Sequence, residues 1–226
     1  MHLQFQTNEL TPPPYSYAVE LKTEATKTGL RVRFELTYLF REHLDIEDIL
    51  AEGFTENDDF TWEGTLNEEW KAHLAILEKE NVFSGKTEID ESEDFWQIQI
   101  ADQTGYPKDT ETWLSFVNEI QQAILEKDER EAPLQITVLR NREKIYFRAS
   151  FAQRQFTVEK NGSLSRKKWE DLNPFLNDLF GGEFRPDQAK QKEPQKAGLY
   201  VETGDGLWYE LGKSLLMQPS KIQQWL

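Results

Sequence analysis

The regular alternation of apolar and polar residues predicts most of the strands in this chain. Leu30, Val32, Phe34 and Leu36 alternate with charged residues, as in a strand that buries one face. Similar patterns occur before and after this segment. We expect strands over residues 17–22, 30–40, 60–63, 95–101, 134–139, 144–152, 156–160, 199–202 and 207–211.

Apolar residues at helical spacing predict the helices. Asn67 is expected to cap a helix whose apolar face is Trp70, Leu74 and Leu77. Asp109 or Thr110 should begin the clearest helix, with a single apolar stripe of Trp113, Phe116, Val117, Ile120 and Ile124. Ser165 is expected to cap a third helix containing Trp169, and short helices should follow Asp45 and Pro219. Residues 185–197 are polar and predict a mobile loop.

A pattern near residue 60 occurs again near residue 156. In each copy an apolar strand leads to a glycine, then to a small hydroxyl residue and a leucine, and then to a helix with an early tryptophan. Such an echo indicates an internal repeat. We therefore expect an α+β fold of two similar halves, residues 1–130 and 131–226, each a small antiparallel sheet packed by amphipathic helices. Residues 41–58 are an extra piece in the first half.

The charge is distributed unevenly between these halves. The 226 residues carry a net charge of −15 and contain no cysteine, which excludes disulfides and thiolate chemistry. Residues 1–130 contain 29 acidic and 11 basic residues, whereas residues 131–226 contain 12 acidic and 15 basic ones. No secretory signal pattern and no apolar run of membrane-spanning length is present, so we expect a soluble, cytoplasmic protein without membrane association.

A basic stretch over residues 140–168 offers a candidate binding face. The candidate face consists of Lys144, Tyr146, Arg148, Arg154 and Lys160. Aromatic and cationic side chains on a sheet can stack bases and neutralise phosphates. Alternatively, these cations pair with acidic groups of the same protein or of a partner, and this interpretation is favoured because the rest of the chain is strongly acidic.

No motif assembles a catalytic, cofactor or metal site. Lys213-Ser214 lacks the upstream glycine of a phosphate-binding loop, because position 207 is leucine. His2, His43 and His73 are scattered and have no cysteine partners, which argues against a transition-metal centre. We therefore assign no catalytic residue, metal ligand or cofactor.

The acidic charge and the missing catalytic motifs favour a non-catalytic protein that binds a protein partner. An inhibitor, an immunity-type protein or a small chaperone for a basic partner fits these features. A sheet-based binder of single-stranded nucleic acid is the first alternative. A hydrolase that depends on carboxylates or a metal is the second.

Overall fold

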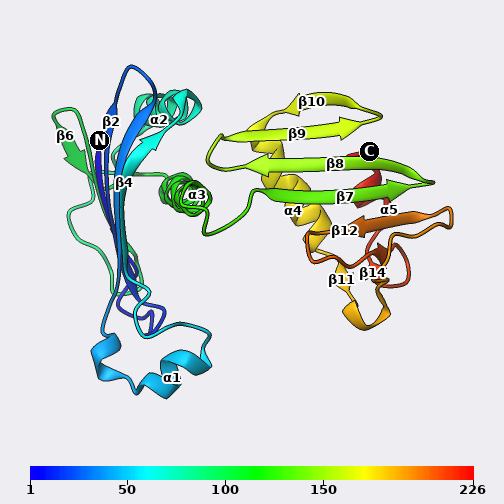
Figure 1. Cartoon of the computed structure of the whole chain (residues 1–226). Coiled ribbons are helices and arrows are strands. Elements are labelled where there is room, and N and C mark those ends of the chain that lie inside the picture. The colour runs from blue at the N-terminus through cyan, green and yellow to red at the C-terminus, as the bar shows by residue number, and fades with distance from the viewer. The chain divides into compact units, whose positions relative to one another are not determined.

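The chain forms two compact units, which we describe separately. A computed structural model describes residues 1–226, and these divide into Met1–Ile124 and Leu125–Leu226. The dividing point lies inside the long helix α3 (Thr110–Lys127). Figure 1 shows both units and labels many of their elements.

The first unit contains a six-stranded antiparallel sheet in the order β4-β3-β2-β1-β5-β6. Its strands are β1 (His2–Gln6), β2 (Tyr17–Ala25), β3 (Leu30–Tyr38), β4 (Phe60–Leu66), β5 (Phe95–Ile100) and β6 (Gln103–Gly105). The sequence did not predict β1, which lies between β2 and β5. Only Leu3 and Phe5 are apolar in this strand, and both are buried.

Helices cover one face of this sheet. They are the helix α2 (Glu68–Glu80) and α3, whereas the short helices η1 (Arg41–His43) and α1 (Ile46–Ala51) belong to the connection between β3 and β4. Figure 1 shows α2 and α3 on the same side of the sheet. The rings of Trp70 in α2 and Phe116 in α3 lie 6.1 Å apart, and both are buried. The predicted apolar stripes of these two helices are therefore confirmed.

The first turns of these helices are capped as the sequence predicted. The side chain of Asn67 accepts a hydrogen bond from the Trp70 backbone N–H at 3.4 Å. Asp109 accepts hydrogen bonds from the backbone N–H and the hydroxyl of Thr112, at 3.0 and 2.8 Å. Each cap satisfies a backbone donor that has no partner within the helix.

The second unit has a second six-stranded antiparallel sheet, in the order β10-β9-β8-β7-β12-β13. Its strands are β7 (Leu134–Arg140), β8 (Glu143–Ser150), β9 (Gln155–Lys160), β10 (Ser163–Lys167), β12 (Leu199–Glu202) and β13 (Tyr209–Glu210). The remaining elements are η2 (Trp169–Asp171), α4 (Leu172–Phe180), η3 (Pro186–Gln188), α5 (Pro219–Gln223) and a two-stranded sheet of β11 (Glu183–Phe184) and β14 (Leu215–Leu216). The rings of Phe147 and Phe175 stack in its core with centroids 4.5 Å apart.

The two units share one topology. In each, four consecutive antiparallel strands form a meander, a helix follows, and a later strand, β5 or β12, pairs with the first strand of the unit. The sixth strand of each large sheet, β6 or β13, then pairs with the fifth, and the last helix of each unit is α3 or α5. The fold is therefore α+β with two similar halves.

The sequence echo does not mark equivalent positions in these halves. Gly64 lies within strand β4, whereas Gly162 lies in the turn that joins β9 and β10. The topological equivalent of β4 is β10, which the sequence did not predict. The expectation that Ser165 caps a helix is wrong, because Ser165 pairs with Val158 in the β9–β10 hairpin.

Part of the predicted mobile loop has defined contacts. Lys190 forms a backbone bridge with Trp208, and its Nζ lies 2.8 Å from Glu210 Oε2. Pro194 is buried, although its neighbours Glu193 and Gln195 are exposed. Residues 190–194 therefore belong to the folded second unit.

Candidate functional sites

Three of the predicted binding residues share one face of the second sheet. Lys144, Tyr146 and Arg148 alternate along β8 with buried core residues. The Arg148 guanidinium carbon lies 4.9 Å from the centre of the Tyr146 ring. The face that the alternation predicted therefore exists in the fold.

Acidic residues of the same unit neutralise two cations of this face. Lys144 Nζ lies 2.7 Å from Glu193 Oε2, and the hydrogen bond to Glu193 raises the pKa of Lys144. Arg148 Nη1 lies 2.6 Å from Glu159 Oε2. These ion pairs are partly exposed, so each contributes at most about 1 kcal/mol to stability. They nevertheless lower the positive charge that the face presents to a ligand.

The other two predicted residues lie elsewhere. Lys160 pairs with Ile145, so its side chain leaves the sheet on the core side, and its Nζ donates to the Leu226 carbonyl at 2.9 Å. Arg154 lies in the turn after β8, and its guanidinium carbon is 5.3 Å from the Trp169 ring centre. The five residues therefore do not form one surface.

Residues 40–58 of the first unit, which we name the acidic excursion, expose large apolar side chains. The segment leaves the end of β3 and contains η1 and α1, which Figure 1 shows beyond the end of the sheet. Phe40, Ile46 and Leu50 are 51%, 46% and 54% exposed, whereas Ile49 is buried. Ile46 and Leu50 are one helical turn apart and therefore lie on the same side of α1.

These apolar residues are surrounded by negative charge. The acidic excursion contains one basic residue, Arg41, and seven acidic residues: Glu42, Asp45, Glu47, Asp48, Glu52, Glu56 and Asp58. This density of carboxylates produces a negative potential, which attracts cationic groups over about 8 Å at physiological ionic strength.

The acidic excursion is held to the sheet by Arg41. The guanidinium carbon of Arg41 lies 3.6 Å from the centre of the Tyr38 ring and 4.5 Å from that of Phe54. Arg41 Nη1 also pairs with Asp58 Oδ2 at 2.6 Å, and Nη2 donates to the Pro14 carbonyl at 3.2 Å. Stacking and ion pairing of this kind fix a guanidinium in one orientation.

Asp58 fixes the far end of the acidic excursion. Its carboxylate accepts hydrogen bonds from the hydroxyl of Thr55 at 2.6 Å and from the Thr55 backbone N–H at 3.0 Å. Burial opposes ionisation of Asp58, but the hydrogen bonds from Thr55 and Arg41 outweigh it and lower the pKa. The ionised carboxylate is therefore the form that holds this loop together.

Phe40 begins the acidic excursion in an unfavourable backbone conformation. Its φ of 62° and ψ of 15° lie in the left-handed region, which bulky residues rarely adopt. Holding such a residue there costs about 1–3 kcal/mol and requires support from its surroundings. The contacts of Arg41 and Asp58 provide that support, while the Phe40 ring stays half exposed.

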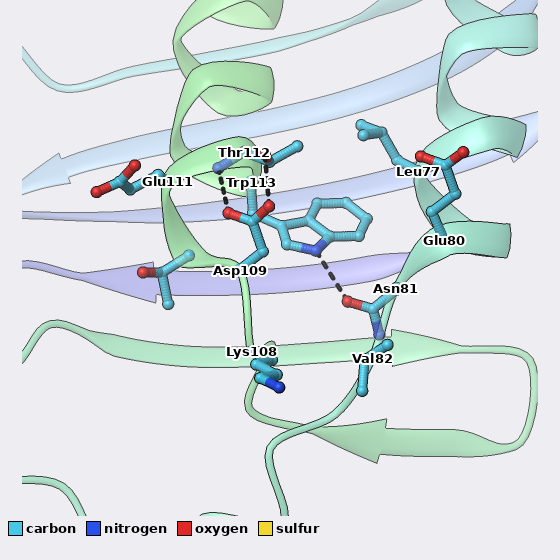
Figure 2. A pocket seen from close by; sticks show the side chains of 10 residues that line it. Leu77, Glu80, Asn81, Val82, Lys108, Asp109, Glu111, Thr112 and Trp113 are labelled. Atoms are coloured by element: carbon cyan, nitrogen blue, oxygen red, sulfur yellow. Dashed lines mark hydrogen bonds between the residues drawn. The ribbon is translucent and has the colours of Figure 1, made fainter.

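A cleft in the first unit lies between the end of α2 and the start of α3. Its volume is about 510 Å³, and Figure 2 shows the side chains that line it. The wall residues are Leu77, Glu80, Asn81, Val82, Lys108, Asp109, Thr110, Glu111, Thr112 and Trp113. Residues 82–84 and 106–108 are joined by two backbone hydrogen bonds, from Lys108 to Val82 and from Ser84 to Tyr106.

Trp113 and Asn81 form a fixed contact in the wall of this cleft. The Trp113 indole N–H donates to Asn81 Oδ1 at 2.9 Å (Figure 2). An indole can only donate, so this bond sets the orientation of the Asn81 amide. Asn81 Nδ2 is buried and has no hydrogen-bond partner. The contact therefore joins the end of α2 to the first turns of α3.

Neither a metal-binding cluster nor a membrane-spanning helix is present. No group of three or more His, Asp or Glu side chains is placed to hold a metal ion. No helix combines the length and apolar character needed to cross a membrane. Comparisons with protein-family models, curated proteins and solved structures gave no match.

Proposed function

We propose that this chain is a non-catalytic binding protein that captures a basic protein partner through the acidic excursion. An inhibitor, an immunity-type protein or a small chaperone acts in this way. The observation that supports the proposal most strongly is the exposure of Phe40, Ile46 and Leu50 within a strongly acidic segment. The proposal keeps the cytoplasmic setting expected from the sequence.

The apolar side chains supply the anchors that such an interface needs. A few large, central residues usually carry most of the binding energy of a protein interface, and a polar rim surrounds them. Phe40 from the start of the excursion and Ile46 and Leu50 from α1 match the anchors, and the seven acidic residues match the rim.

The charge defines the chemistry of the partner. Complementary potentials accelerate association and exclude partners of like charge. A net charge of −6 over residues 41–58 therefore selects a partner surface rich in lysine or arginine around an apolar pocket. The same charge disfavours nucleic acid at this position, because phosphates are repelled.

The internal contacts of Arg41 and Asp58 reduce the entropy that binding must overcome. A loop already fixed in its bound conformation loses less freedom on association. Since the Arg41 guanidinium lies on two rings and bonds Asp58, the apolar anchors are presented from an ordered segment.

The test combines affinity capture with variants of the anchors. Phe40→Asn removes the ring but keeps a residue that tolerates the left-handed conformation, and Ile46→Ala with Leu50→Ala truncates α1. Leu164→Ala, which removes an exposed leucine of the second unit, is the matched control. Bound protein and nucleic acid are both identified, and each purified binder is titrated against every variant.

The expected result is a basic protein whose affinity falls at least about 100-fold with the triple variant and is unchanged by the control. Its affinity should also decrease as salt is raised. The proposal would be overturned by a protein that binds the triple variant as tightly as the wild type. It would also be overturned if a nuclease-sensitive nucleic acid were the only ligand.

A further inference from the structure

We infer that the cleft between α2 and α3 binds an organic cation with a short aliphatic chain, the chemistry of an arginine or lysine side chain. This inference is independent of the proposed function, because the cleft and the acidic excursion share no lining residue. It depends on the size of the cleft, its apolar wall and the excess of carboxylates over basic residues among its lining residues.

The cleft has the size and the apolar wall of a small-ligand site. Its volume of about 510 Å³ lies within the range of pockets that hold small molecules. Leu77 and Trp113 are buried at its base, whereas Val82 is 60% exposed. An exposed valine beside a concave wall offers surface that an aliphatic chain can cover.

Negative charge predominates around this apolar wall. Glu80, Asp109 and Glu111 contribute carboxylates, and Lys108 is the one basic residue among the lining residues. Glu80 and Glu111 are both exposed. Figure 2 shows them from opposite elements, Glu80 at the end of α2 and Glu111 at the start of α3.

The position of Glu80 also favours a cationic ligand. It is the last residue of α2, where the helix dipole is negative and the final carbonyl groups lack partners within the helix. A carboxylate at this end is unfavourable unless a positive charge is close, and the one basic residue of this last turn, Lys79, does not line the cleft. A bound guanidinium or ammonium group supplies that charge and can donate to the free carbonyls.

Asp109 has a different role from the two glutamates. Its carboxylate is already engaged by Thr112, and the backbone hydrogen bond from Thr112 lowers its pKa. Replacing Asp109 removes the cap of α3, so its variants cannot separate binding from folding. Glu80 and Glu111 are therefore the residues to change.

The experiment titrates three small probes into the full chain and follows the Trp113 indole N–H by two-dimensional NMR. The first probe is butylguanidinium; butylurea is its neutral isostere, and butyrate is an anion of similar chain length. The variants are Glu80→Gln, Glu111→Gln and the double variant. Glu63→Gln, an exposed acid on the uncovered face of the first sheet, is the matched control.

Butylguanidinium should shift the Trp113 resonance and bind at least tenfold more tightly than butylurea or butyrate. Each single glutamine variant should weaken binding about threefold to tenfold at low ionic strength, and Glu63→Gln should leave it unchanged. Thermal unfolding of each variant shows that the fold is intact. Equal binding of the guanidinium and the urea, or unchanged affinity in the double variant, would overturn the inference.

Discussion

Removal of the Glu126 carboxylate should destabilise the second unit more than any exposed charge does. Glu126 lies in the last turn of α3 and is 9% exposed. Its oxygens accept hydrogen bonds from the backbone N–H groups of Phe151 and Ala152, at 2.9 and 3.0 Å, and from the Ser150 hydroxyl at 2.8 Å. These contacts fix the turn that leads from β8 to β9.

The expected loss follows from the hydrogen bonds that each substitution removes. Hydrogen bonds to charged groups contribute about 1.5–3 kcal/mol, and an unsatisfied buried donor costs about 1–3 kcal/mol. Glu126→Gln keeps one acceptor oxygen but places an amide NH₂ opposite a donor, so we expect a loss of about 2 kcal/mol. Glu126→Ala leaves both backbone N–H groups without this acceptor and should cost about 3 kcal/mol or more.

Urea denaturation and thermal unfolding measure these losses. A loss of about 2 kcal/mol should lower the melting temperature of a unit of this size by about 10 °C. Hydrogen exchange assigns the effect, because the amides of β8 and β9 should lose protection. Glu129→Gln, an exposed glutamate three residues later, is the control. If the free energies of unfolding of Glu126→Gln and Glu129→Gln agree within about 0.5 kcal/mol, the hydrogen bonds of Glu126 do not stabilise the second unit.

Three further predictions concern the acidic excursion and a buried tyrosine. Arg41→Lys should speed hydrogen exchange within the acidic excursion at least tenfold, because an ammonium group does not stack on both rings; unchanged exchange would contradict the role of the guanidinium. The pKa of Asp58 is lowered in the folded state. The ionised Asp58 therefore contributes its full stabilisation of the acidic excursion above pH 3.8, the ordinary pKa of aspartate, and this stabilisation is lost as the pH falls through the lowered pKa. Proteolysis of the excursion at decreasing pH should show this loss in the wild type but not in Asp58→Asn. Burial, followed by the hydrogen bond to Asp205, raises the pKa of Tyr209 to about 12. In an ultraviolet titration, Asp205→Asn should therefore shift the ionisation of one late-ionising tyrosine to lower pH, and an unchanged titration curve would contradict this role of Asp205.

The sequence predicts elements well where the apolar pattern is long. The stripe from Trp113 to Ile124 identifies α3, because five apolar residues at helical spacing have no competing interpretation. Prediction from the apolar pattern fails for β10, where Leu164 is the only apolar residue and is 65% exposed. An edge strand of this kind depends on its partner β9 and on the Asn161-Gly162 turn, and its own side chains carry no burial pattern.

Candidate sites were predictable only where one strand carries all of the residues. Alternation along β8 places Lys144 and Arg148 together. The same alternation along β9 places Lys160 on the core side together with Phe156 and Val158. The sequence therefore contained the information that Lys160 does not share the face of Lys144 and Arg148. The cleft brings together residues 77–82 and 108–113 through pairing of Phe83 with Pro107. No local pattern contains that pairing.

The central position of β1 sets the order in which the first unit can form. His2 pairs with Lys22 on one side and with Gln99 on the other. The second pairing closes a loop of nearly the whole unit, and such distant contacts slow folding. A ribosome must therefore release β5 before this sheet can close, and until then one edge of β1 stays open to pairing with another chain.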